Sequence, residues 1–126
     1  MKKIIETTNA PAPIGPYSQA IQYHGMVYTS GQIAIDPQTG ALNNGSVAQE
    51  TKQIMENLKA VLAAAGLTFE QVIKTTIFLT NMDDFGLVNS IYGAYFNEAS
   101  APARETVQVV RLPKDVRVEI SMIAGQ

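Results

Sequence analysis

The strongest constraint on the fold is an amphipathic stretch between Ser46 and Gly66. Apolar side chains recur there at steps of three and four residues, which places them along one face of an α-helix. Ser46 and Gln49 have the spacing of a capping box at the start of this helix, and Gly66 is a typical residue at its end. The apolar face consists of Val47, Thr51, Ile54, Met55, Leu58, Val61, Leu62 and Ala65. Such a helix can cover one face of a sheet.

A second helix and several strands are predicted around this helix. The second helix starts near Asn81 or Asp83, and its apolar face consists of Phe85, Val88, Tyr92, Tyr95 and Phe96. The predicted strands are Lys3–Glu6, two runs that flank a tight turn at His24–Gly25, 72–80, Glu105–Arg111 and Arg117–Ala124, with 112–116 joining the last two. The order β-β-β-α-β-α-β-β, in 126 residues without a linker or repeat, indicates one α+β domain. We expect a mixed sheet with two helices packed on one face.

Several predicted strands are apolar on both faces, although the helices cover only one face of the sheet. In the strand at 72–80, one side carries Ile73, Ile77 and Leu79, and the other carries Val72, Thr76 and Phe78. A face without a helix would leave a large apolar patch in water, which is unusual for a monomer. We therefore expect another subunit to cover this face. The alternative is that β-branched residues occur there for their strand propensity alone.

Composition and charge exclude several kinds of protein. The chain has no cysteine, which excludes disulfides, thiolate zinc sites and a cysteine nucleophile. Its nine Lys and Arg residues are scattered and its net charge is −2, so nucleic acid is not an expected partner. The apolar part of the N-terminal run MKKIIETTNAPAP stops before Glu6, too early for a signal peptide, and no stretch reaches the length of a membrane span, about 18 apolar residues. A cytoplasmic location is compatible with these features.

No familiar catalytic motif is present. The single histidine, His24, lies in a predicted turn, where a histidine is usually solvated. One histidine without a cysteine cannot form a histidine-rich metal site or a Cys-His pair. The chain also lacks the glycine-rich motifs that cradle phosphate and the GxSxG motif of serine hydrolases.

The candidate site residues are polar side chains in unusual places. Tyr17 follows a rigid Gly-Pro pair, and Ser30 and Gly31 interrupt a strand pattern. A glycine within a strand often marks the close approach of a ligand or of another part of the chain. Arg104 stands at the entrance of a predicted strand, and Glu119 lies inside an apolar one. Each also has a structural alternative: Arg104 and Glu119, for example, could be exposed or could pair with each other.

Five stretches, taken in order, resemble the RidA (YjgF) family. They are IGPYSQA at 14–20, TSGQIAIDPQTG at 29–40, NLKAVLAAAG at 57–66, PARETVQV at 102–109 and LPKDVRVEI at 112–120. The resemblance runs nearly from end to end. It implies a chorismate-mutase-like α+β fold assembled as a homotrimer. It also implies hydrolysis of reactive enamines and imines, such as 2-aminoacrylate and 2-iminobutyrate, to 2-keto acids and ammonia. The sites would lie in clefts between subunits and need no metal or cofactor.

The resemblance assigns roles to seven residues. Arg104 would anchor the carboxylate of the imino acid and Glu119 would activate water. The substrate-binding positions would be Tyr17, Ser30, Gly31, Asn89 and Thr106. Deaminases of the family commonly have cysteine at the position of Thr106, and this departure leaves the substrate preference open.

Strand geometry does not bring the two catalytic candidates together within one subunit. If the last two strands form a hairpin centred on Lys114, Glu119 pairs near Val109. Five residues of extended strand separate Val109 from Arg104, which is too far for direct contact. A site between subunits, which the resemblance implies, would remove this difficulty. Two rival functions are a module that binds small carboxylates without turnover and, against the acidic charge balance, a ribonuclease or translation inhibitor.

Overall fold

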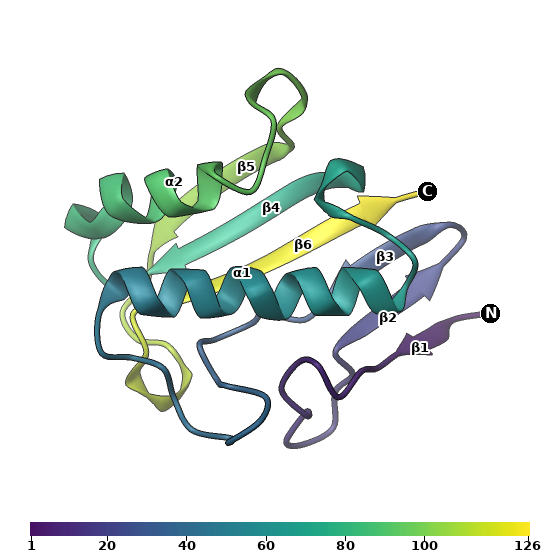
Figure 1. The fold of residues 1–126 in the computed structure, drawn as a ribbon, viewed down its shortest axis with the longest axis horizontal. Coiled ribbons are helices and arrows are strands. Elements are labelled where there is room, and N and C mark those ends of the chain that lie inside the picture. Colours follow the sequence, from purple (N-terminus) through teal and green to yellow (C-terminus); the bar gives the residue numbers. More distant parts are fainter.

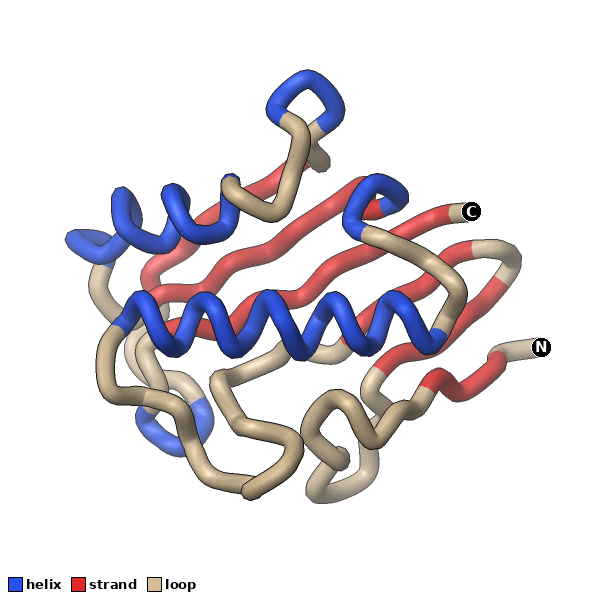
Figure 2. The backbone as a smooth tube through the Cα atoms, in the orientation of Figure 1, coloured by secondary structure: helices blue, strands red, loops and turns tan.

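The computed structural model describes residues 1–126 as one six-stranded mixed sheet with two helices on the same face (Figures 1 and 2). The elements are β1 (Lys3–Ile5), β2 (Ala20–Tyr23), β3 (Met26–Thr29), α1 (Val47–Ala64), β4 (Val72–Leu79), α2 (Phe85–Gly93), β5 (Ala103–Gln108) and β6 (Val118–Gly125). The predicted element order and the α+β architecture are confirmed. Neither helix has the combination of length and hydropathy that a membrane span requires.

The order of strands across the sheet is β1-β2-β3-β6-β4-β5. β4 and β5 are parallel and are joined through α2, whereas all other neighbours are antiparallel. The expected hairpin between the last two strands is wrong, because β4 lies between β5 and β6. The crossover through α2 makes β5 the edge partner of β4. β6 alternates buried and half-buried side chains along its whole length, as suits a central strand, and pairs with β3 and β4.

The ends of α1 follow from the residues predicted to cap it. Ser46 Oγ accepts a hydrogen bond of 3.0 Å from the backbone N–H of Gln49, which satisfies one free donor of the first turn. At the other end Gly66 has a φ of 76°, the left-handed conformation that glycine adopts without strain. The backbone N–H groups of Gly66 and Leu67 donate back to Ala63 and Leu62, which is a Schellman motif.

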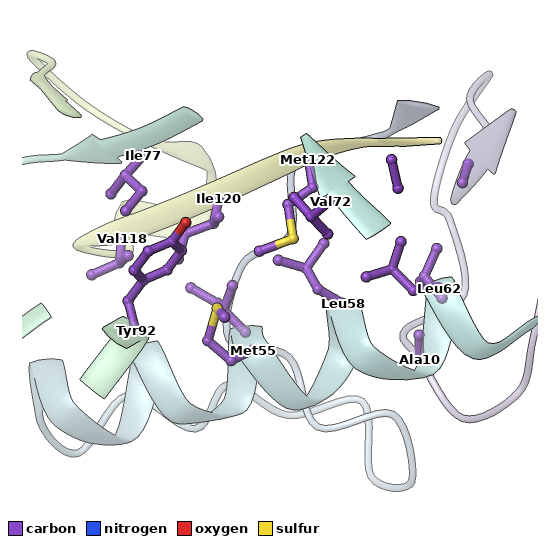
Figure 3. Packing of buried hydrophobic residues seen from close by; sticks show 14 of the residues in the cluster. Ala10, Met55, Leu58, Leu62, Val72, Ile77, Tyr92, Val118, Ile120 and Met122 are labelled. Atoms are coloured by element: carbon purple, nitrogen blue, oxygen red, sulfur yellow. The ribbon is translucent and has the colours of Figure 1, made fainter. Parts of the chain in front are cut away.

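The core lies between the helices and the covered face of the sheet. Figure 3 shows Val118, Ile120 and Met122 of β6 pointing toward Met55 and Leu58 of α1. All five of these side chains are at most 2% exposed. Burying one such side chain stabilises the fold by about 1.5–3 kcal/mol, which is why this layer fixes α1 against the sheet.

The opposite face of the sheet has no helix over it. A register shift between Val72 and Lys74 in β4 turns Val72 into the core, where it is 4% exposed, and leaves Ile73 53% exposed. The sequence-based assignment of these two side chains was therefore wrong, because a bulge reverses the alternation along a strand. The uncovered face nevertheless presents large apolar side chains that are substantially exposed. They include Ile4, Tyr23, Tyr28 and Val107.

Candidate active site in two halves

Arg104 projects from β5, the edge strand, toward α2. Its Nη1 donates a hydrogen bond of 2.6 Å to Asn89 Oδ1, and its guanidinium carbon lies 5.6 Å from the ring centre of Phe85 and 5.2 Å from that of Tyr92. Arg104 has no carboxylate partner within the chain. We call Phe85, Asn89, Tyr92 and Arg104 the Arg104 half-site. All but Phe85 line a cavity of about 610 Å³.

The ring of Tyr92 is fixed from the strand beside Arg104. Tyr92 is buried, and its hydroxyl donates a hydrogen bond of 2.9 Å to Thr75 Oγ1. Thr75 is the residue of β4 that pairs with Arg104 in the parallel register. Burial raises the pKa of the Tyr92 hydroxyl, so this group stays neutral and can donate. The buried floor of the half-site is therefore built from β4 and α2 together.

Glu119 is the second residue of β6 and projects onto the uncovered face. It lines a second cavity of about 510 Å³ together with Tyr17, Ser30 and Gly31, so four of the seven predicted residues meet there. We call these four residues the Glu119 half-site. Ile14, Ile33 and Ile35 also line this cavity. Partial burial among them raises the pKa of the Glu119 carboxyl group, because leaving water disfavours the charged form.

Gly31 allows the Glu119 carboxylate to lie against the backbone. A Cβ atom at position 31 would stand 2.5 Å from Glu119 Oε2 and 2.8 Å from Cδ, closer than any ordinary contact. The next residue, Gln32, exchanges two backbone hydrogen bonds with Ile120 of β6 at 2.8 and 3.1 Å. The glycine in the TSGQ motif therefore marks a close approach, as the sequence suggested, and the approaching group is Glu119.

Gln19 holds the proline-rich segment 9–16, which walls the Glu119 half-site, and Ser30 holds Ser18 just after it. Ser30 Oγ donates a hydrogen bond of 2.6 Å to the carbonyl of Ser18, so its hydroxyl can offer only acceptor capacity to a ligand. The buried Gln19 side chain accepts from the Thr7 N–H at 2.7 Å and donates to the carbonyl oxygens of Thr7, Ala10 and Pro11 at 3.0, 3.3 and 2.8 Å. Sequence reasoning missed Gln19, whose signal was a glutamine in an apolar context.

The two half-sites lie on opposite faces of the sheet. Arg104 pairs with Thr75 of β4, whereas Glu119 pairs with Phe78 of the same strand, not near Val109 as the hairpin register predicted. Three residues along β4 and two strand spacings separate the catalytic candidates, about 10 Å in each direction. The expectation that one chain cannot join them holds, although for a different register. The alternative of a direct Arg104–Glu119 ion pair is wrong for this chain.

The remaining candidates divide between these regions. Thr106 lies on the Arg104 side of β5, and its buried Oγ1 has no hydrogen-bond partner. Lys114, which sequence reasoning treated only as part of a connection, lines the Glu119 cavity with a φ of 57°, which is unusual for a residue other than glycine. His24 sits at the tip of the β2–β3 turn with a φ of 50° and lines neither cavity. The structure brings together no cluster of three or more acidic or histidine side chains of the kind that holds a metal ion.

Several known proteins are similar to this chain over nearly its whole length. The model of the family described as Endoribonuclease L-PSP matches residues 7–126. A RutC family protein of Synechocystis is 57% identical over 123 residues, covering 97% of this chain and 95% of that protein. The 2-iminobutanoate/2-iminopropanoate deaminase of Mus musculus is 52% identical over 126 residues, covering 100% of this chain and 93% of the mouse protein. Escherichia coli TdcF, in a crystal structure with bound serine, is 47% identical in sequence to this chain. The two structures match with a TM-score of 0.92, and the match covers 98% of each chain.

Proposed function

Because the chain belongs to the RidA (YjgF) family, we propose that it hydrolyses short 2-imino acids, such as 2-iminobutanoate and 2-iminopropanoate, to 2-keto acids and ammonia. The observation that carries the proposal is the complementary chemistry of the two half-sites. One offers a guanidinium with no carboxylate partner, and the other offers a carboxyl group in a partly apolar cavity. An imino acid presents the matching groups, a carboxylate beside an electrophilic C=N carbon.

Arg104 would bind the substrate carboxylate. A guanidinium can donate two parallel hydrogen bonds to a carboxylate, and only one of its N–H groups is engaged by Asn89. Each charge-assisted hydrogen bond contributes about 1.5–3 kcal/mol. This contact fixes the direction of the neighbouring C=N carbon and so presents one face of it to water.

Glu119 would move the protons. The ionised carboxylate takes a proton from water while the water oxygen forms a bond to the carbon of the protonated imine. The resulting amino alcohol receives that proton on nitrogen, and the C–N bond breaks as the C=O bond forms. The carboxylate of Glu119, ionised again, takes the hydroxyl proton and passes it to the departing ammonia. The iminium form of the substrate and water thus become a 2-keto acid and an ammonium ion. A carboxyl group with a raised pKa suits both directions of this transfer.

A neighbouring copy of the chain would join the half-sites. Because they occupy opposite faces of the sheet, the Arg104 half-site of one copy must meet the Glu119 half-site of another, which is a head-to-tail contact. Head-to-tail contacts that close produce rings. A ring of three is the homotrimer that the sequence resemblance implies, and it would also cover the exposed Tyr28 and Val107 on the uncovered face.

The test generates the unstable substrate in place. A dehydratase forms 2-iminobutanoate in the cuvette, and keto-acid release is timed with and without the protein. We expect the protein to accelerate release and Arg104→Ala to abolish the acceleration without changing the molar mass in light scattering. The control is Lys59→Ala, an exposed residue of α1 outside both half-sites. Turnover that is unchanged in Arg104→Ala would contradict the proposal.

A second candidate function is the binding of small carboxylates without turnover. It is favoured by the free guanidinium of Arg104, which serves binding as well as catalysis, and by the serine bound in the TdcF structure. Titration calorimetry with 2-ketobutyrate combined with the kinetic assay separates the two: binding without acceleration of imine loss selects the binding module.

Ribonuclease activity, which the description of the family model names, finds less support in this chain. Neither half-site contains a histidine, and the net charge is −2. RNA binding by the pure protein that weakens steeply with salt would favour this function instead.

A further inference from the structure

We propose that Phe85 and Tyr92 are positioning residues, which form an aromatic cradle that orients the Arg104 guanidinium and thereby sets the affinity for carboxylates. The inference rests on the proposed role of Arg104 as the carboxylate anchor. It assigns a function to two side chains that the sequence places merely on the apolar face of α2.

The cradle follows from the spacing on α2. Phe85, Asn89 and Tyr92 stand at positions i, i+4 and i+7, so all three project from the same side of the helix. Both ring centres lie within 6 Å of the guanidinium carbon, the range in which a cation is attracted to the face of an aromatic ring. Asn89 meets the same guanidinium at one N–H group. Three contacts from one rigid element therefore converge on a single cation.

Phe85 has no other evident task. It is 37% exposed, it is not part of the buried core, and its ring stacks on no other aromatic side chain. A large apolar side chain left half in water at the first turn of a helix gains little from burial. The group that its ring faces is Arg104.

Tyr92 has a second contact, which ties its ring to the strand beside Arg104. Its hydroxyl is bound to Thr75, which pairs with Arg104 across the β4–β5 ladder. The backbone of Arg104 and the ring that its side chain meets are thus both held by β4. An arginine on an exposed edge strand is otherwise rich in rotamers, and ordering it in advance reduces the loss of freedom when a carboxylate binds.

The cradle predicts a selective effect on binding. A carboxylate is held by Arg104 in both the ground state and the transition state, so loss of the cradle should raise KM and leave kcat nearly unchanged. One cation–aromatic contact at a partly exposed site corresponds to a change of about two- to fivefold in Kd. Phe85→Leu should therefore raise the Kd for 2-ketobutyrate by about this factor, and Phe85→Tyr, which keeps the ring, should retain the wild-type affinity.

Phe69→Leu is the matched control. Phe69 loses the same aromatic ring in this substitution, but it packs against Tyr95 and Phe96 at 5.5 and 5.3 Å rather than against Arg104. We expect Phe69→Leu to lower the melting temperature without changing the Kd. An equal rise in Kd for Phe69→Leu and Phe85→Leu would show that the effect is general loosening, and would overturn the proposal.

The experiment combines calorimetry with nuclear magnetic resonance of the full-length protein. The Arg104 Nε–H signal is assigned by its loss in Arg104→Lys, and its shift reports directly on the aromatic rings around it. We expect this signal to move in Phe85→Leu and to stay in place in Phe69→Leu, together with the selective rise in Kd. A signal and a Kd that Phe85→Leu leaves unchanged, while Arg104→Lys weakens 2-ketobutyrate binding, overturn the cradle and leave the proposed function standing. If Arg104→Lys does not change 2-ketobutyrate binding, both the cradle and the proposed function are overturned. If the cradle is confirmed but the protein does not hydrolyse the imine, only the proposed deaminase activity is overturned.

Discussion

Replacing Gly31 with alanine tests how closely the Glu119 carboxylate is held against the backbone. The added Cβ would stand 2.5 Å from Oε2, 2.8 Å from Cδ and 3.0 Å from Cγ of Glu119, whereas carbon atoms in good contact are about 3.5–4.0 Å apart. The carboxylate must therefore move by about 1 Å. A displacement of this size at a reacting group can lower a rate by about 100-fold.

The expected result is a loss in kcat without a matching loss in binding. In the dehydratase-coupled assay with 2-iminobutanoate, kcat of Gly31→Ala should fall by about 10- to 100-fold. The Kd for 2-ketobutyrate should change by less than about twofold, because the added Cβ meets only Glu119 and leaves the Arg104 guanidinium, which binds the carboxylate, in place. Forcing Glu119 away from its preferred rotamer should cost about 1 kcal/mol of unfolding free energy.

Gly86→Ala provides the control for this substitution. A Cβ atom at Gly86, in the first turn of α2, would meet no atom within 4 Å. Alanine is the better helix former, so this variant should keep its activity and gain up to about 1 kcal/mol in unfolding free energy. A kcat for Gly31→Ala within twofold of the wild-type value would refute the reasoning that Glu119 needs its present position.

Three further predictions concern stability and pH. Gln19→Leu removes four hydrogen bonds to the proline-rich segment and should lower the unfolding free energy in urea by about 2–3 kcal/mol, and a loss below about 0.5 kcal/mol would be inconsistent with this role. Glu50→Gln removes the buried carboxylate that accepts a hydrogen bond of 2.6 Å from Arg117. Because the Arg117 side chain is 39% exposed, we expect the unfolding free energy to fall by about 2 kcal/mol, and an unchanged value would contradict this role. The raised pKa of Glu119 should make kcat/KM increase with pH through a midpoint above the ordinary value of 4.5, since the base must be ionised. Folding stability should fall with pH over the same window, because the folded state binds this proton more tightly, and Glu119→Gln should remove that slope in thermal melts.

Local patterns predicted the elements that depend on local interactions. α1 could be predicted because its apolar period, its cap at Ser46 and its glycine terminator agree with one another. The turn at His24–Gly25 was predictable for a similar reason, since both residues adopt positive φ there, at 50° and 78°. In each case the information lies within a few residues of sequence.

The choice of strand partners was not local, and this is where the prediction failed. Adjacent strands in sequence usually pair, but the crossover through α2 placed β4 between β5 and β6. The bulge after Val72 likewise depends on how β4 fits against β6. Because faces follow from register, no sequence pattern could show that Arg104 and Glu119 occupy opposite faces.

The candidate site was predictable as a set of residues and not as an arrangement. The motifs indicated Tyr17, Ser30, Gly31 and Glu119, and the structure brings these four into one cavity. The aromatic rings around Arg104 were assigned to the helix core instead, because an apolar residue on a helix face has the same signal whether it packs on a sheet or on a cation.

The most direct test of the account mixes two inactive variants. Arg104→Ala and Glu119→Gln subunits are denatured together in equal amounts and refolded, and imine hydrolysis is compared with that of each variant refolded alone. If the site joins Arg104 of one subunit to Glu119 of its neighbour, every mixed trimer contains one intact site, and random assembly should restore about a quarter of the wild-type activity. If the mixture is no more active than the separate variants, although mass spectrometry shows mixed trimers, the site does not lie between subunits and the account is wrong.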